Sequence, residues 1–416
     1  MTTQGVPERI GQIRLRKVYD SRGNPTVEAT ILSDVDRAAM ASCPSGASTG
    51  SHEVVSFPDG SVDRGIEFAM TRVVPHLQGR SLGQQQPFDA ELKDRDGTGN
   101  FASLGGNIAS ALSLAYARAS AAAEGRELFD YVARLRGRRP GRPPAIVGNV
   151  MNGGVHAVGG PSIQEFIAFV EAPGFRIQVE AAVQVHREVG RRLRERFPSA
   201  ALGRGDEGGW VAPTDDEQAL EILAQSCQAV QASGRFPGAT IRPGLDFAAS
   251  ELYRDGRYHY RGRSLTPEEQ VAFVHGLVER FDLAYAEDPF DEEGFSEFAA
   301  LTRRLPTGRK VHVVGDDLYT TSPGRVLRGI EGKATNSVLL KVNQVGTLSD
   351  TLETVALADR AGWSTITSHR SGETTDTWLS HLSIGFGSAG IKCGVLGGER
   401  IAKLNELLRI AGDASS

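Results

Sequence analysis

The feature of this sequence that most constrains its fold is a series of short apolar segments, each ending in an ionisable residue. In order, the segments end at Asp246, Glu287, Asp316, Lys341, His369 and Lys392. Successive members lie roughly 25 to 40 residues apart, about the length of one strand followed by one helix. Helical patterns at residues 267–280 and 347–362 fill two of the intervals. Alternating strands and helices predict a parallel sheet, and ionisable residues at successive strand ends are typical of a (β/α)8 barrel. The alternative is an open doubly wound sheet with charges placed by coincidence.

A different pattern precedes this series. Short β-type segments flank a turn within residues 13–32, and an Ala- and Leu-rich helix is expected at residues 107–124. Residues 136–144 are rich in Pro, Gly and Arg and are the best candidate for a linker. A chain of 416 residues is too long for one core. We therefore expect two domains, residues 1–135 and residues 145–416.

Composition excludes several classes of protein. The net charge is −5 and no long basic run is present, so nucleic acid is not an expected partner. The chain has no apolar run long enough to span a membrane and no basic-then-apolar leader, so we expect neither a membrane protein nor a secreted one. Cys43, Cys227 and Cys393 are widely spaced without a CxxC pair, which excludes a disulfide framework and a cysteine zinc site. These features suit the reducing cytoplasm.

Three of the strand-end residues carry carboxylates. Asp246, Glu287 and Asp316 would converge at one rim of such a barrel. Carboxylates without compensating arginines repel one another, so a bound cation is the natural resolution. Because the set offers only oxygen ligands, it favours magnesium (Mg²⁺) over zinc. The alternative is three separate surface acids near loops.

Two further members of the series are lysines, in a chain that contains few. Only seven of the 46 basic residues are lysine. Arginine serves wherever only charge matters, whereas a desolvated lysine can also act as a base. Lys341 and Lys392 would lie close together near a divalent ion and lower each other's pKa, which makes one of them a candidate general base. Taken singly, each lysine could instead lie at the surface with its ammonium group in water.

Other motifs supply an anion site and a second pair of acids. His369, Arg370 and Ser371 offer an imidazole, a guanidinium fork and a hydroxyl, which suits a phosphate. Glu165 and Glu207 form the second acidic pair, and the glycines beside Glu207 let backbone and ligand approach closely. Exposed turn acids are the alternative for this pair.

Two segments are ambiguous on their own. The hydroxyl-rich loop at residues 45–50 is either a plain linker or a lid over a metal-bound anion. His156, in a glycine-rich stretch, has no clear role by itself. The whole set still comprises a base, a divalent metal, an acid pair and an anion clamp. Those are the parts needed to remove a proton beside a carboxylate and to expel a poor leaving group.

On these motifs the sequence resembles the enolase family from about residue 13 to residue 410. The residues that carry the resemblance are 20–28, 44–50, 164–166, 205–209, 244–246, 287–290, 315–318, 339–346, 368–374, 391–394 and 399–410. The resemblance implies an N-terminal α+β domain that caps an atypical barrel, Mg²⁺ dependence, and interconversion of 2-phosphoglycerate and phosphoenolpyruvate. It also implies a homodimer or higher homo-oligomer, with Glu28 and Arg409 paired across a two-fold interface.

The resemblance also implies roles for individual residues. Lys341 matches the base that takes the C2 proton, and Glu207 matches the acid that helps the 3-hydroxyl to leave, with Glu165 beside it. The implied metal ligands are Asp246, Glu287 and Asp316 for the first ion and the lid residue Ser48 for the second. The implied substrate-binding residues are His156, Gln164, His369, Arg370, Ser371 and Lys392.

Several loops depart from the family pattern. Residues 56–60 and 64–65 replace an acidic stretch and a Lys-Gly pair, and residues 157–160 and 395–398 also differ. The differences lie near the mouth of the site, so they bear on the substrate more than on the chemistry. A paralogue of phosphonate biosynthesis, similar to carboxyphosphonoenolpyruvate synthase, is the second hypothesis. A binding protein on an enolase scaffold is the third, and the intact ionisable set argues against it.

Overall fold

An antiparallel sheet of three strands begins the chain: β1 (Ile10–Tyr19), β2 (Pro25–Ser33) and β3 (Ala38–Ser42). The computed structural model describes residues 8–46, 50–154, 157 and 159–412. The helices of this N-terminal part are α1 (Val62–Phe68), α2 (Val74–Leu77), α3 (Gln85–Asp96), α4 (Gly106–Ala123) and α5 (Leu128–Leu135). The expected helix at residues 107–124 is α4. Its small residues are buried from Gly106 to Ala117, and it packs on β2 and β3.

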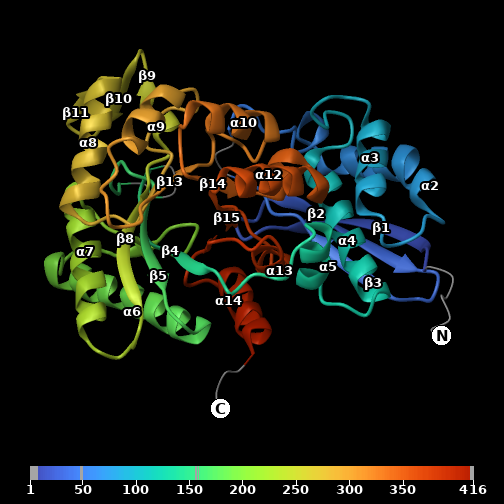
Figure 1. Ribbon diagram of the computed structural model, residues 1–416, viewed down its shortest axis with the longest axis horizontal. Helices are drawn as coiled ribbons and strands as arrows, with labels where there is room; N and C mark the ends of the chain where they lie inside the picture. Colours follow the sequence, from blue (N-terminus) through green and yellow to red (C-terminus); the bar gives the residue numbers. More distant parts are fainter. Residues whose placement is uncertain (1–7, 47–49, 155–156, 158, 413–416) are drawn as a thin grey trace.

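The rest of the chain forms a closed barrel of eight strands, seen at the left of Figure 1. The strands are β4 (Ala145–Asn152), β5 (Glu165–Glu171), β8 (Thr240–Asp246), β12 (Tyr285–Glu287), β13 (His312–Gly315), β14 (Ser337–Leu340), β15 (Ser364–Ser368) and β16 (Gly390–Lys392). Pairing of β16 with β4 closes the barrel. The fold is therefore the expected barrel with an N-terminal α+β domain beside it.

One strand contradicts the expected all-parallel sheet. β5 runs antiparallel to both of its neighbours, with Ile167 opposite Asn149 on β4 and Gly244 on β8. A parallel crossover normally needs a helix between the strands, and the described part of the connection between β4 and β5 contains no α-helix. The reversal brings the first residue of β5, Glu165, to the rim where the other strands end.

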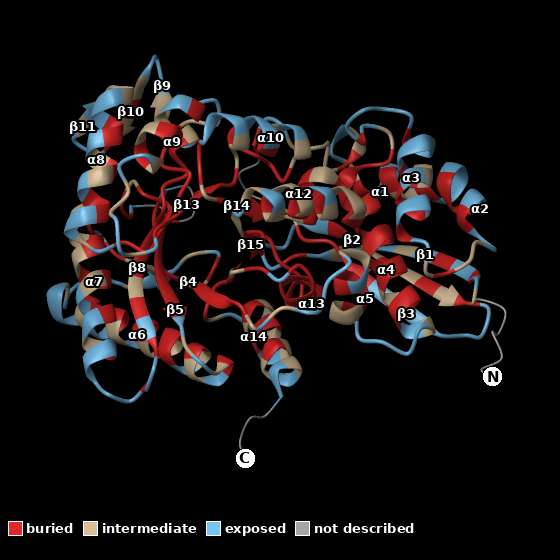
Figure 2. Ribbon diagram, in the orientation of Figure 1, coloured by how far each residue is buried: buried red, intermediate tan, exposed pale blue. Residues whose placement is uncertain are grey.

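Helices surround the barrel strands, and Figure 2 shows exposed outer faces on most of them. They are α6 (Phe175–Arg196), α7 (Asp216–Ala232), α8 (Pro267–Arg280), α9 (Phe295–Thr302), α10 (Pro323–Gly332), α11 (Val342–Val345), α12 (Leu348–Ala361), α13 (Trp378–Gly385) and α14 (Gly398–Ala411). The expected helices at 267–280 and 347–362 are α8 and α12. Thr266 and Glu269 form a capping box at the start of α8, and Gly362 ends α12 in the left-handed conformation.

Short strands add two small features. β6 (Gly203–Arg204) and β7 (Trp210–Val211) extend the barrel sheet from β4, while β9 (Tyr253–Arg254), β10 (Arg257–Tyr260) and β11 (Arg263–Leu265) form a separate sheet. The barrel interior is filled by an apolar cluster that includes Val147, Phe169, Val314, Leu339 and Ile366. Because the interior is packed, a ligand of the barrel binds at its rim rather than inside it.

The N-terminal domain is fixed to the barrel by buried and half-buried polar contacts. Asp89 of α3 accepts hydrogen bonds from the backbone N–H (3.0 Å) and the hydroxyl (2.6 Å) of Ser349 at the start of α12. Arg118 of α4 pairs with Asp376 at 2.6 Å. Residues 136–144, the expected linker, join α5 to β4 without a helix or strand, and Arg136 within them pairs with Asp359 at 2.7 Å.

Candidate active site

The carboxyl rim of the barrel collects the strand-end residues that the sequence singles out. Asp246 and Glu287 are neighbours in the parallel register of β8 and β12, and Glu165 lies opposite Asp246 across the antiparallel pair. Lys392 ends β16. Because β5 is reversed, Glu165 reaches this rim from the start of its strand rather than from the end.

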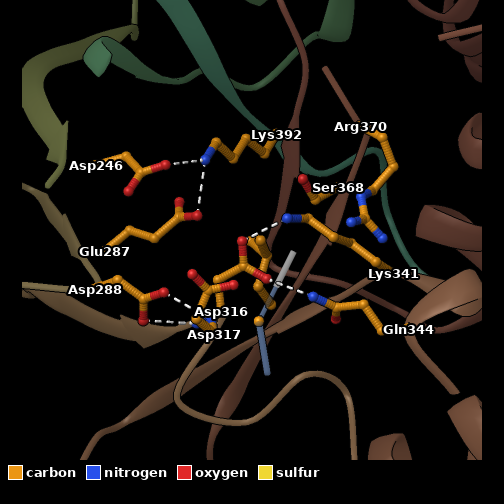
Figure 3. Close-up of polar contacts among 12 residues, drawn as sticks. Asp246, Glu287, Asp288, Asp316, Asp317, Lys341, Gln344, Ser368, Arg370 and Lys392 are labelled. Carbon is orange, nitrogen blue, oxygen red and sulfur yellow. Dashed lines mark hydrogen bonds and ion pairs between the residues drawn. The ribbon is translucent and has the colours of Figure 1, made fainter. Parts of the chain in front are cut away.

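Lys392 lies among three carboxylates, and Figure 3 shows its contacts with two of them, Asp246 and Glu287. Its Nζ is 2.7 Å from Asp246 Oδ2, 2.7 Å from Glu287 Oε1 and 3.2 Å from Glu165 Oε1, and the residue is 3% exposed. The hydroxyl of Tyr285 donates to the other oxygen of Glu287 at 2.5 Å. Burial and the neighbouring Asp246 raise the pKa of Glu287 to about 8, and burial and Glu207 raise the pKa of Glu165. One ammonium group therefore does not compensate this set of acids.

Lys341 lies on the opposite side of the cavity and forms an ion pair with Asp316. Gln344 Nε2 donates to the other oxygen of Asp316 at 2.9 Å. Asp288 supports the same segment, because its two carboxylate oxygens accept the backbone N–H groups of Asp316 (2.9 Å) and Asp317 (2.7 Å). Figure 3 shows these contacts below the Lys392 cluster.

Lys392 does lower the pKa of Lys341, as expected, but the net pKa of both lysines is raised in the ligand-free protein. Burial is the largest effect on Lys341 and lowers its pKa, but the nearby carboxylates, Asp316 first and then Glu287, together raise it above its ordinary value. The pKa of Lys392 is raised in the same way by Asp246, Glu165 and Glu287. Each ammonium group is held charged by carboxylates, and the repulsion between the lysines is the smaller effect.

Arg370 bridges the barrel and the N-terminal domain. Its guanidinium is 3.0 Å from each oxygen of Glu53 and 3.0 Å from Oδ1 of Asn343. Both members of the ion pair are buried, with exposed side-chain fractions of 3% and 5%. The guanidinium fork expected to bind an anion is thus occupied by a carboxylate of the chain itself.

His369 faces the acid of the glycine-rich segment. Its Nε2 lies 3.4 Å from Oε2 of Glu207, and the same oxygen accepts a hydrogen bond from Asn149 at 2.9 Å. On the other side of the ring, Nη1 of Arg400 lies 2.8 Å from Nδ1. Burial is the main reason that the pKa of His369 falls to about 4.

One cavity brings most of the predicted residues together. It is lined by Gly46, Gln164, Glu165, Glu207, Asp246, Asp316, Lys341, Ser368, His369, Arg370, Ser371 and Lys392. Glu287 adjoins it through Lys392. The two other predicted residues, Ser48 and His156, lie outside the described residues.

The donor set fits a cation. Among the described residues, carboxyl groups around the cavity outnumber the cations Lys341, Lys392 and Arg370, and Oε2 of Glu165 is buried without a hydrogen-bond partner. Oxygen ligands of this kind suit a hard divalent ion. A second grouping is also possible on geometry, because oxygens of Asp288, Asp316 and Asp317 lie within 4.8 Å of one another. Asp316 belongs to both groupings.

A closed barrel with ionisable groups buried at its carboxyl rim, and with a second domain beside that rim, defines a barrel enzyme. Comparison with known proteins gives the family. Residues 10–132 match the model of the enolase N-terminal domain, and residues 143–416 match the enolase C-terminal TIM barrel domain. The chain belongs to the enolase family.

Relatives match over nearly the whole chain. The enolase of Thermoplasma acidophilum is 44% identical over 401 residues, covering 96% of this chain and 98% of the relative. The enolase of Natronomonas pharaonis is 45% identical over 408 residues, covering 97% and 99%. The enolase of Halorubrum lacusprofundi is 44% identical over 410 residues, covering 98% and 99%.

Several residues of the site are not among those predicted from the sequence. Glu53, Asn149 and Arg400 contact predicted site residues directly, yet none ends an apolar segment. Arginine is so common in this chain that Arg400 carries no compositional signal. Lysine was informative only because it is rare. The partners of these three residues become visible only when segments distant in sequence come together.

Proposed function

We propose that this protein is a divalent-metal-dependent enolase that interconverts 2-phosphoglycerate and phosphoenolpyruvate. The observation that carries the proposal is the meeting of Lys341 with Asp316, and of Lys392 with Asp246 and Glu287, at the rim of a barrel in an enolase-family chain. Membership of the family supports an enzyme that acts on a small phosphorylated acid. The relatives, all named enolase, do not favour the phosphonate alternative.

In this proposal Lys341 takes the C2 proton of the substrate, and Glu207 gives a proton to the departing 3-hydroxyl, which leaves as water. Glu165 lies beside these groups, and its carboxylate and that of Glu207 repel each other. Arg370, Ser371, His369 and Gln164 bind the phosphate and carboxylate groups. His156 and Ser48 keep the roles that the family resemblance implies.

The residues proposed to hold the metal are Asp246, Glu287 and Asp316. A bound Mg²⁺ would offset the negative charge that builds on the substrate carboxylate as the proton leaves. Asp316 is also the carboxylate that keeps Lys341 protonated. A cation bound by Asp316 therefore favours release of that proton, which Lys341 must lose before it acts as a base.

The proposal also covers the location and the assembly of the protein. The described residues include no helix with the length and apolarity needed to cross a membrane. All three cysteines are free and buried, which supports a reducing cytoplasm. We also propose a homodimer, and a division into an N-terminal domain (1–135) and a barrel domain (145–416).

An activity assay with two substrates, in the presence and absence of metal, separates the candidate functions. Purified protein with Mg²⁺ should convert 2-phosphoglycerate to phosphoenolpyruvate, followed by the ultraviolet absorbance of the enol product. Chelation of the metal should abolish the signal, and added Mg²⁺ should restore it. A protein that shows no turnover of 2-phosphoglycerate but turns over a phosphonate analogue would overturn the proposal in favour of the second hypothesis.

A further inference from the structure

Arg400, in the first turn of α14, is an arginine with no exposed surface. Its Nη1 lies 2.8 Å from Nδ1 of His369 and 2.6 Å from the carbonyl oxygen of Arg370. Its Nη2 lies 2.6 Å from the carbonyl oxygen of Ser371 and 3.4 Å from that of Asp206. One buried guanidinium therefore contacts both segments that carry the proposed acid and anion-binding groups.

The contact with His369 settles where the imidazole carries its proton. A guanidinium has only N–H donors and does not lose its proton in proteins. Nδ1 of His369 must then accept the hydrogen bond from Arg400, so the neutral ring carries its hydrogen on Nε2. Nε2 is buried and lies 3.4 Å from Oε2 of Glu207.

We propose that Arg400 is a positioning residue that holds His369 neutral, with its hydrogen on Nε2 directed at Glu207 and the cavity. The role of this donor in catalysis rests on the proposed function, in which Glu207 is the acid. The protonation state of the His369 ring does not depend on the proposed function. A doubly protonated His369 would set an N–H against the N–H of Arg400, which the geometry disfavours.

Charged groups face His369 from three sides. Glu207 comes from the segment before β7, Glu373 from the segment that follows His369 itself, and Arg400 from α14. Burial and the charge of Arg400 favour the neutral ring, whereas the two carboxylates favour the imidazolium. Glu373 is also paired with Lys403 at 2.7 Å, so part of its charge is already offset. Loss of Arg400 removes the cation that contacts the ring while Glu207 remains, so His369 should take up a proton at higher pH.

Arg400 also holds the backbone at Arg370 and Ser371, and the two roles separate by substitution. Arg400→Met keeps the length of the side chain but removes every donor and the charge. Arg400→Lys keeps a charge and a donor for Nδ1 but loses the fork that reaches two carbonyl groups. Arg136→Met is the matched control, because Arg136 is mostly buried, forms a two-pronged pair with Asp359 and contacts none of the proposed site residues that the structure describes.

The first measurement is the pH dependence of kcat/KM. We expect the acid limb of Arg400→Met to move at least one unit toward neutral pH and its rate at pH 8 to fall about 10- to 100-fold, as for loss of a partner that orients a functional imidazole. Arg400→Lys should keep the limb of the parent while losing part of the rate. Arg136→Met should keep both. An unmoved limb in Arg400→Met would overturn the proposal.

The second measurement does not use the reaction. Nitrogen-15 NMR of histidine-labelled parent protein, with the His369 signal assigned by its loss in His369→Gln, reports which ring nitrogen is protonated. We expect an unprotonated Nδ1, a protonated Nε2 and no titration above pH 5. A hydrogen on Nδ1 of His369, or titration of the ring near pH 6.5, would contradict the proposal even if Arg400→Met fails to fold. An inactive protein with the expected tautomer would leave the positioning role intact and count against the proposed function alone.

Discussion

Glu53 and Arg370 form a buried, two-pronged ion pair between the N-terminal domain and the barrel, with both N–O distances at 3.0 Å. Arg370 is also the guanidinium proposed to bind the substrate anion. An anion that binds there must compete with, or rearrange, a carboxylate already in place. The ion pair between the domains and the binding of an anion at the site therefore both depend on the side chain of Arg370.

Glu53→Ala should destabilise the ligand-free protein by about 3–5 kcal/mol, because it leaves the Arg370 charge buried and unpaired. Inorganic phosphate should raise the melting temperature of this variant more than that of the parent, since the anion can replace the lost carboxylate. Asp376→Ala is the control, because it removes another interdomain ion pair, that with Arg118. An equal response to phosphate in all three proteins would show that Arg370 does not bind the anion.

Lys341→Arg should retain the fold and metal binding but lose proton abstraction by about 10²–10⁴-fold, since a guanidinium keeps the charge and cannot accept a proton. Exchange of the C2 hydrogen of the substrate with deuterated solvent measures this step directly. Lys333→Arg, at the exposed end of α10, is the matched substitution and should exchange at the rate of the parent. Exchange at the parental rate in Lys341→Arg would mean that another group is the base.

The metal ligands can be assigned by comparing neutral substitutions. Asp316→Asn should raise the Mg²⁺ concentration for half-maximal activity by about tenfold or more, because a neutral amide replaces a charged ligand. Glu287→Gln should do the same, whereas Asp317→Asn should have a smaller effect. The reverse order for Glu287 and Asp317 would move the ion to the grouping of Asp288, Asp316 and Asp317.

The interdomain contact of Asp89 predicts a pH dependence of stability. Burial raises the pKa of this carboxyl to about 6. A raised folded-state pKa means that the folded protein binds the proton more tightly than the unfolded chain. Stability from this group is therefore full below pH 4 and is lost as pH rises toward 6, by about 3 kcal/mol.

Asp89→Asn removes the titration while an oxygen acceptor remains for Ser349. Urea unfolding at pH 4, 5, 6 and 7 should show the parent losing stability, relative to this variant, across that window. A constant difference between the two proteins would mean that Asp89 does not titrate there.

Glu28→Leu tests the expected dimer. In the single chain Glu28 already pairs with Arg16 at 2.6 Å, and Arg409 pairs with Glu127 at 3.0 Å. A pair between Glu28 of one subunit and Arg409 of the other would have to replace or extend these contacts. A two-fold axis would form that pair twice. Light scattering at micromolar concentration should show the parent as a dimer and Glu28→Leu shifted toward monomer. A parent that is monomeric throughout rules out the interface.

Much of the site could be read from residue order. Four strand ends were predictable, because an apolar segment is buried as a strand and the charged residue that follows it must lie where that strand ends. They are those at Asp246, Glu287, Lys341 and Lys392. The scarcity of lysine sharpened the prediction for two of them. The helices at residues 267–280 and 347–362 were also predicted. The caps that the structure shows at their ends, Thr266 and Gly362, act on neighbours only a few residues apart.

Other features were decided only by the tertiary structure. The reversal of β5 is a matter of how a connection closes in space, and it alone carries Glu165 to the rim. The raised pKa of Lys341 depends on Asp316, and the tautomer of His369 depends on Arg400, each pair being brought together from different elements. Local sequence determines where a strand or helix begins and which residues end it. Charge states and partners depend on distances of a few ångströms between segments far apart in the chain, and those distances exist only once the barrel has closed.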